Sequence, residues 1–180
     1  ASIGVDAFDV AIVAVGGTNI DTGLPNTLQM TAPAGATVVS PLTTLVQHTA
    51  TQRGVSAADA QTLRRAALGI PAEVDLVHFD PLAQAPGDVD ALAVQQVAAQ
   101  VATLATLAPE GGTTFASLAA SLATAGEAPL DLADAAVLQS ILPDAPAQVL
   151  DQVAAINQAL GNSTSLTDIS AIQAAVATDT

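Results

Sequence analysis

The chain has 180 residues, of which 51% are hydrophobic and only 2% aromatic, and it contains no cysteine, tryptophan or tyrosine. Its formal net charge is −14, because 17 acidic residues stand against three arginines and no lysine. This charge argues against binding to nucleic acid or to an anionic membrane surface, and the lack of cysteine excludes disulfides and thiolate metal sites. With 41 alanines, the core is expected to consist of Ala, Leu, Val and Ile in closely packed helices.

The length fits one domain, or one domain plus a fragment of another. No apolar run is long enough for a transmembrane helix, and no basic segment leads into an apolar one. We therefore expect neither a membrane span nor an intact signal peptide. Because the first residue is Ala1 rather than Met, we interpret the chain as a processed product or a piece of something longer.

Residues 1–39 are predicted to form a β segment. In Phe8–Val15 larger apolar residues alternate with smaller or polar ones, β-branched residues dominate, and two glycines follow, which indicates a strand. Thr27–Thr31 alternates in the same way before a Pro33–Gly35 break, so a hairpin-like strand pair is expected. Two strands cannot form a stable sheet alone, so they must either pack on the helices or pair with strands outside this chain.

Residues 40–180 are predicted to form an Ala-rich helical domain. Ser40 is an expected N-cap, Pro41 suits the first helical position, and Leu42, Leu45 and Val46 then fall on one face. About seven helices with short connections predict a mainly α fold, a bundle or orthogonal array that is about 55–70% helical. The predicted helices lie at residues 41–54, 56–69, 88–108, 114–125, 131–142, 145–160 and 166–178, with a loop at 73–87.

Residues 36–46 read ATVVSPLTTLV. This segment resembles one found in large bacterial secreted or surface proteins of the adhesin type, which carry cadherin-like, immunoglobulin-like or repeats-in-toxin modules. GGTNIDTGLP and TAPAGA precede it, and AALGIPAEVDLVHFDPLA follows it, in the order of that family, so the resemblance extends to about Ala85. It implies an exported, multidomain, non-catalytic setting in which the last strands of a sandwich run into a helix. It carries no catalytic residues.

Asn19, Asp21 and Gly23 form an N-x-D-x-G pattern, in which two side-chain oxygens could surround a cation while the glycine permits a tight turn. A full calcium loop needs more carboxylates and a bidentate acid beyond the glycine, and none is near. We therefore prefer an ordinary turn stabilised by Asx-type hydrogen bonds and keep calcium binding at Asn19 and Asp21 as the alternative.

Two further acidic groups are candidate metal sites. Asp75 and Asp80 lie on the predicted loop with His78, where they could collect a divalent ion by charge alone. Asp88 and Asp90 stand at a predicted helix start, where carboxylates are favoured without any metal. We prefer solvated or capping roles for both groups.

His48 and His78 could be axial haem ligands or a metal pair, since imidazole serves both purposes. Neither lies in a ligand-spacing motif, so a surface and a loop histidine are the preferred interpretation, with His48 kept as a cofactor ligand only if the protein carries haem or a pigment. Met30 is expected to fill a gap between sheet and helices. The three arginines, Arg53, Arg64 and Arg65, are expected to pair with nearby acids.

Catalysis is not expected, because two histidines, three glutamates and no Lys, Tyr or Cys leave few general acids, bases or nucleophiles. The leading hypothesis is a non-catalytic structural or interaction module of an exported bacterial surface protein, with other domains of a larger chain or copies of itself as partners. One alternative is a carrier of an apolar ligand such as haem, a pigment or a lipid between the helices. Another is a subunit that self-assembles into a filament or layer by strand addition at Phe8–Val15.

Overall fold

The computed structural model describes residues 10–19, 22–108, 111–124 and 129–178. These residues form a two-stranded sheet followed by seven α-helices and one 3-10 helix, and 58% are helical. The predicted mainly α fold with a small N-terminal β segment is therefore confirmed. The elements are β1 (Ile12–Ala14), β2 (Met30–Ala32), α1 (Pro41–Arg53), α2 (Ala57–Leu68), η1 (Pro81–Ala83), α3 (Val89–Leu107), α4 (Gly111–Thr124), α5 (Ala135–Ile141), α6 (Ala147–Gly161) and α7 (Leu166–Thr178).

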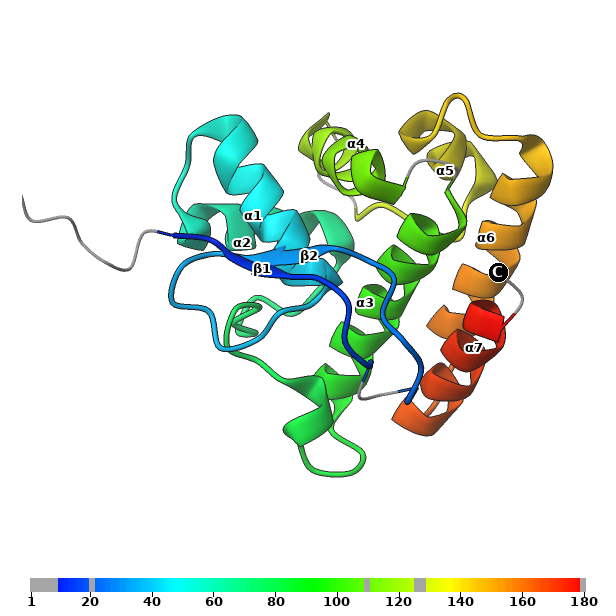
Figure 1. The fold of residues 1–180 in the computed structure, drawn as a ribbon, viewed down its shortest axis with the longest axis horizontal. Coiled ribbons are helices and arrows are strands. Elements are labelled where there is room, and N and C mark those ends of the chain that lie inside the picture. The colour runs from blue at the N-terminus through cyan, green and yellow to red at the C-terminus, as the bar shows by residue number, and fades with distance from the viewer. Residues whose placement is uncertain (1–9, 20–21, 109–110, 125–128, 179–180) are drawn as a thin grey trace, which may run out of the picture.

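Helix α3 is the central helix. It contacts α1, α4, α6, α7 and η1, and Figure 1 shows it between the α1, α2 and α4 side of the molecule and the α6 and α7 side. The main hydrophobic core contains residues from each of the helices α1 through α6. A second cluster of Ala99, Leu160 and Ile169 joins α3, α6 and α7. Since α3 contributes to both clusters, it holds the two sides together.

Helix α1 begins at a complete capping box. The Ser40 hydroxyl accepts the Thr43 N–H at 3.2 Å, and the Thr43 hydroxyl accepts the Ser40 N–H at 2.8 Å. Pro41 occupies the first helical position, where no N–H is needed. The helix ends at Gly54, which has φ 63°, a left-handed conformation that glycine adopts without strain. Both ends therefore lie where the sequence predicts them.

The first turn of α1 also covers one edge of the sheet. The Thr44 hydroxyl accepts the Thr31 N–H at 2.9 Å, and the hydroxyl oxygens of Thr43 and Thr44 lie 3.0 and 3.1 Å from the Thr31 carbonyl oxygen. Thr43 and Thr44 are buried, so these bonds are shielded from water. The outer edge of β2 is therefore capped by side chains and has no room for another strand.

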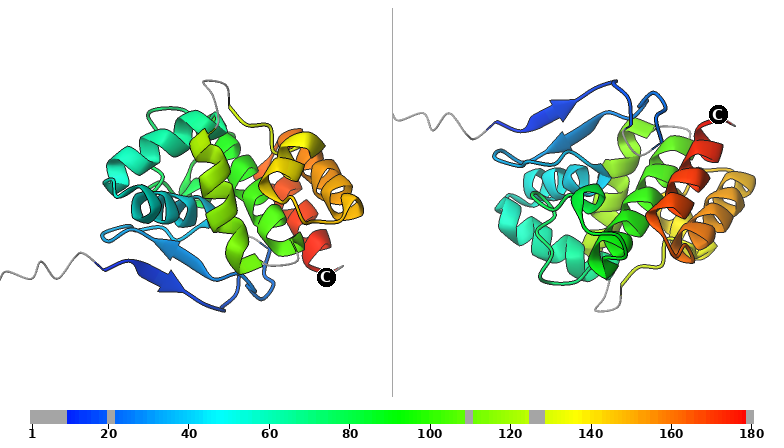
Figure 2. Two further views of the ribbon diagram at one scale, coloured as in Figure 1. Left: turned by 90° about the horizontal axis from the view of Figure 1, so that it is seen from above. Right: turned by 90° about the horizontal axis from the view of Figure 1, so that it is seen from below.

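The sheet pairs β1 with β2 in antiparallel register, with Ile12 opposite Ala32, Val13 opposite Thr31 and Ala14 opposite Met30. Figure 2 shows the sheet along one face of the helical array, with β2 on the side of the helices and β1 outside it. Strand β2 packs on α1, whereas β1 packs mainly on β2. The predicted strands are present but short, and Phe8 lies outside the described residues.

Helix α2 buries one arginine among its apolar residues. Leu63 is 37% exposed, whereas Arg64 is only 1% exposed. Arg64 follows Ala60 by four residues and precedes Ala67 and Leu68, which are all buried, so the four share one helix face. No acidic residue in the described part of the chain pairs with Arg64, so the ion pair expected for it is absent there.

The surroundings of Arg64 contain little polar compensation. One Nη1–H donates to the Ala119 carbonyl oxygen in α4 at 3.2 Å, and Nε has no hydrogen-bond partner. Burial, followed by the charge of Arg53, lowers the pKa of Arg64 to about 10. Arg65 likewise bonds to a backbone oxygen, that of Val74 at 2.6 Å, rather than to an acid.

Glutamine side chains of α3 attach α6 to the centre. Gln96 donates to the Gly161 and Ser163 carbonyl oxygens at 3.1 and 2.8 Å, and Gln100 donates to the Asn157 carbonyl oxygen at 2.9 Å. Buried Asn157 donates to the Leu132 carbonyl oxygen at 2.7 Å. These bonds fix the end of α6, where backbone carbonyls lack partners within the helix.

Helices α4 and α5 begin three or more residues away from their predicted starts. Helix α4 starts at Gly111, before Thr114, because burial of Phe115, Leu118 and Leu122 outweighs the low helix propensity of glycine. Helix α5 starts after Asp134, not after Asp131. The Asp134 carboxylate accepts the Ala136 N–H at 2.7 Å, whereas Asp131 stabilises only a preceding turn.

Replacing the buried cation is expected to stabilise the fold. Arg64→Met should raise the free energy of unfolding by on the order of 1 kcal/mol or more, because a desolvated charge that pairs with no carboxylate in the described part of the chain is replaced by an apolar chain of similar length. The gain should persist at every pH below about 10, where the folded state keeps the charge. Urea denaturation would measure it.

Arg65→Met is the matched control for this substitution, because the half-exposed Arg65 loses its bond to Val74 without relieving a buried charge. We expect Arg65→Met to be neutral or mildly destabilising. A clear loss of stability in Arg64→Met would contradict the assignment of Arg64 as an uncompensated charge.

Candidate functional site

Strand β1 and the residues directly beside it carry most of the large apolar side chains that the described part of the chain exposes. Val10, Val13 and Val15 are 78%, 56% and 75% exposed, and Ile12 is also exposed. Val13 and Ile12 are neighbours along a strand, so their side chains point to opposite faces of the sheet. Apolar side chains therefore remain uncovered on both faces of β1.

The backbone of β1 is also open on its outer side. In an antiparallel pair, the N–H and C=O of one residue point to the same side, and successive residues alternate. Both groups of Thr31 point to α1, so Thr31 and Val13 form a pair that exchanges no hydrogen bond. It follows that the N–H and C=O of Val13 point away from β2, toward an edge at which no described residue pairs with them.

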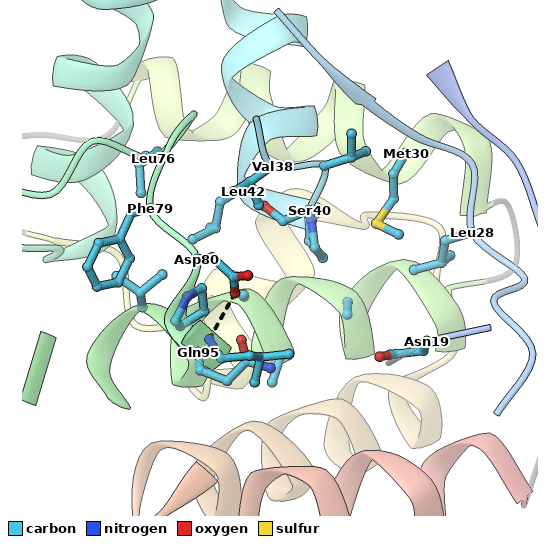
Figure 3. Close-up of a pocket in the computed structure, with 18 of the residues that line it drawn as sticks. Asn19, Leu28, Met30, Val38, Ser40, Leu42, Leu76, Phe79, Asp80 and Gln95 are labelled. Carbon is cyan, nitrogen blue, oxygen red and sulfur yellow. Dashed lines mark hydrogen bonds between the residues drawn. The ribbon is translucent and has the colours of Figure 1, made fainter. Parts of the chain in front are cut away.

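A cavity of about 330 Å³ lies between β2, the segment leading into α1, the loop before η1 and helix α3. Figure 3 shows Leu28, Met30, Val38 and Leu42 around it, with Phe79 and Asp80 at the other end. The Asp80 carboxylate accepts the Leu82 N–H at 2.9 Å, which caps η1. The predicted position of Met30 between sheet and helices agrees with this lining.

A second cavity of about 240 Å³ adjoins the first and shares Asn19, Leu28, Ala102 and Gln173 with it. Small-molecule sites usually measure about 300–1,000 Å³, so each cavity is small for a pigment or haem. None of the described residues that line either cavity is a histidine.

The structure places His48 away from both cavities. Its ring stacks on Phe115 of α4, with ring centres 6.5 Å apart and planes at 6°. Burial lowers the pKa of His48, so the neutral ring is favoured. The side chain is half-buried rather than on the surface, and its contact with Phe115 joins α1 to α4.

Asn19 lies in a tight turn. Its N–H donates to the Leu24 carbonyl oxygen, and its own carbonyl oxygen accepts the Gly23 N–H, each at 2.8 Å. Gly23 has φ 71°, the conformation that the glycine of the N-x-D-x-G pattern was expected to supply. Asp21 lies outside the described residues, so calcium binding by Asn19 and Asp21 stays a prediction.

His78 bridges two loops. Its Nδ1 lies 2.9 Å from the Asp75 carboxylate, and its Nε2 lies 3.3 Å from the Gly35 carbonyl oxygen. Both neighbours are acceptors, and a neutral imidazole has a single N–H, so only the protonated ring can donate to both. Next to this bridge, the Val77 carbonyl oxygen accepts the N–H groups of Thr37 and Val38 at 2.9 and 3.3 Å.

The electrostatics agree with a protonated bridge. The hydrogen bond to Asp75 raises the pKa of His78 above 6.5; desolvation opposes it, while the charge of Asp75 and the bond to Gly35 add to the increase. For Asp75, desolvation would raise the pKa, but hydrogen bonds from His78 and Val77 outweigh it and lower the pKa below 3.8. His78 is therefore a loop histidine, as predicted, and it forms an ion pair with Asp75 in which both side chains stay about half exposed.

The remaining candidate acids act as caps. Asp88 accepts the Ala91 N–H at 2.9 Å at the start of α3, as expected, and Asp90 stands in the same first turn. Among the described residues, no cluster of three or more His, Cys, Asp or Glu side chains could hold a metal ion. None of the described helices is both long enough and apolar enough to cross a bilayer.

Comparison of the chain with family models, curated proteins and solved structures finds no match.

The His78 bridge predicts a specific pH dependence. Because the folded-state pKa of His78 is raised, its contribution to stability is complete below pH 6.5 and is lost as the pH rises through the folded pKa. Asp75 also stabilises the fold, but its contribution depends on pH in the opposite direction. It is present above pH 3.8 and is lost as the pH falls through its lowered folded pKa.

NMR titration of the His78 ring would test this bridge. The pKa should lie above 6.5 in the parent chain and fall in Asp75→Asn, while the pKa of His48 should stay below 6.5 in both. A His78 pKa that is unchanged by Asp75→Asn would contradict the bridge.

Proposed function

We propose that the chain is a non-catalytic structural and interaction module of an exported bacterial surface protein, and that it joins its partner by strand addition at the outer edge of β1. The observation that carries this proposal is the contrast between the two sheet edges. The Thr43 and Thr44 hydroxyls close β2, whereas the N–H and C=O of Val13 have no partner among the described residues and lie beside exposed valines. An exposed apolar edge strand of this kind is a template for another strand.

The helical array would hold this edge in a fixed position. Strand β2 is fixed to α1 by the Thr31 bonds, and α1 belongs to the main core. A strand added to β1 would therefore be held against a structure with a buried interior, rather than against an isolated hairpin, which is marginally stable in water.

The exported setting is supported by the resemblance of ATVVSPLTTLV and its flanking segments to bacterial surface proteins. The net charge of −14 fits such a setting, since it keeps a module soluble in salty surroundings where screening weakens self-repulsion.

The apolar-carrier alternative finds some support in the two adjoining cavities, although their size and the placement of His48 fit a haem or pigment poorly. A small apolar ligand without a histidine contact is the form of this alternative that fits best.

A labelled peptide that copies residues 6–17 is a suitable probe of the β1 edge, because it supplies a strand of matching length and character. We expect saturable binding in fluorescence anisotropy. Val13→Pro should weaken it about tenfold, because proline removes the outward N–H without breaking a bond to β2.

Val13→Thr is the matched control, since it keeps the N–H and the β propensity, and it should retain most of the binding. If the peptide fails to bind, or if Val13→Pro binds as well as the parent chain, the proposal is wrong. A Val13 amide that is already protected from hydrogen exchange in the free chain would also contradict it.

A further inference from the structure

We infer that the strand added to β1 is β1 of a second copy, and that the product is a closed dimer. This inference rests on the proposed function and names the partner of the same edge. A pair of β1 strands related by a two-fold axis at Val13 would place each Val13 opposite its counterpart. Both would then exchange N–H···O bonds, because the N–H and C=O of Val13 point outward together.

The sequence of β1 suits pairing with itself. Residues 10–19 contain no charged side chain, so two copies can align this segment without placing like charges opposite each other. The two-fold register sets Ala11 opposite Val15 of the second copy and Ile12 opposite Ala14 of the second copy. The two Val13 side chains, which are exposed in the single chain, would then lie beside each other on one face of the joined sheet.

The capped edge of β2 limits the assembly to two copies. Pairing through β1 would create a four-stranded sheet with a β2 strand at each outer edge. Both of these edges are occupied by the Thr43 and Thr44 hydroxyls and by the body of α1. No strand edge would remain for a third copy, so this pairing gives a discrete dimer instead of a filament or layer.

The charge of the whole chain sets the conditions for association. Each copy carries −14, so long-range repulsion opposes the encounter at low ionic strength. Salt screens charges that are more than about 8–10 Å apart and leaves the short apolar contact intact. Dimerisation should therefore strengthen as salt is added, which is the opposite of an interface held by ion pairs.

Cysteine cross-linking can test the register, because the chain has no cysteine of its own. Paired Val13 residues would have Cα atoms about 5.5 Å apart, within the range of roughly 4.4–6.8 Å that a disulfide spans. We expect Val13→Cys to form a disulfide-linked dimer rapidly under mild oxidation. Val89→Cys is the control, since Val89 is 77% exposed on α3, far from β1 in the sequence, and should cross-link slowly.

Sedimentation analysis over a wide range of protein and salt concentration completes the test. We expect a monomer–dimer equilibrium that salt strengthens, that Val13→Pro abolishes, and that shows no larger species. Circular dichroism of Val13→Pro checks that the helices are intact. Equal cross-linking of Val13→Cys and Val89→Cys, a dimer that survives Val13→Pro, or growth beyond two copies would overturn the inference.

The outcomes separate this inference from the proposed function. If the peptide of residues 6–17 binds but the chain stays monomeric at all salt concentrations, then β1 accepts strands and the second copy is the wrong partner. If neither the peptide nor a second copy binds, both proposals fail.

Discussion

The Thr31 backbone and the first turn of α1 form the contact on which the arrangement of sheet and helices depends. Two threonine hydroxyls take up the N–H and C=O that a third strand would otherwise bond. Thr43 does this while completing the capping box of its own helix, so the start of α1 and the edge of β2 are stabilised by the same side chains. The contact explains why the two edges of so small a sheet differ.

Composition has shaped the rest of the core. Because aromatic residues are scarce, α3 packs closely against its neighbours through alanine, valine and leucine, and amide side chains supply much of the directional bonding. Gln96, Gln100 and Asn157 all bond to backbone carbonyls, which lie near helix ends or in the loop before α5. Such bonds specify how α6 sits on α3, since alanine surfaces alone allow several alignments.

Local signals predicted much of the helical framework, because caps such as Ser40, Ser56 and Asp88 act within their own turn. The spacing of Arg64 from Ala60 and Leu68 is compatible with burial, but the sequence favours an ion pair with a nearby acid, because arginine is almost never fully buried without a partner. The bridge from His78 to Gly35 spans 43 positions and has no periodic signature. The open edge of β1 could be anticipated as an apolar strand, but the closure of β2 depends on tertiary contacts.

The register of the sheet also determines how the chain would respond to pulling. Ile12 and Ala32 form the pair at the open end of β1 and β2, and the chain leaves Ala32 directly toward α1. A force that enters before Ile12 and is resisted by α1 loads this pair first, so the bonds between the strands break one after another instead of together. The β segment would then peel from the molecule at low tension while the helices stay folded, and the long connection between β1 and β2 would lengthen as a compliant spacer.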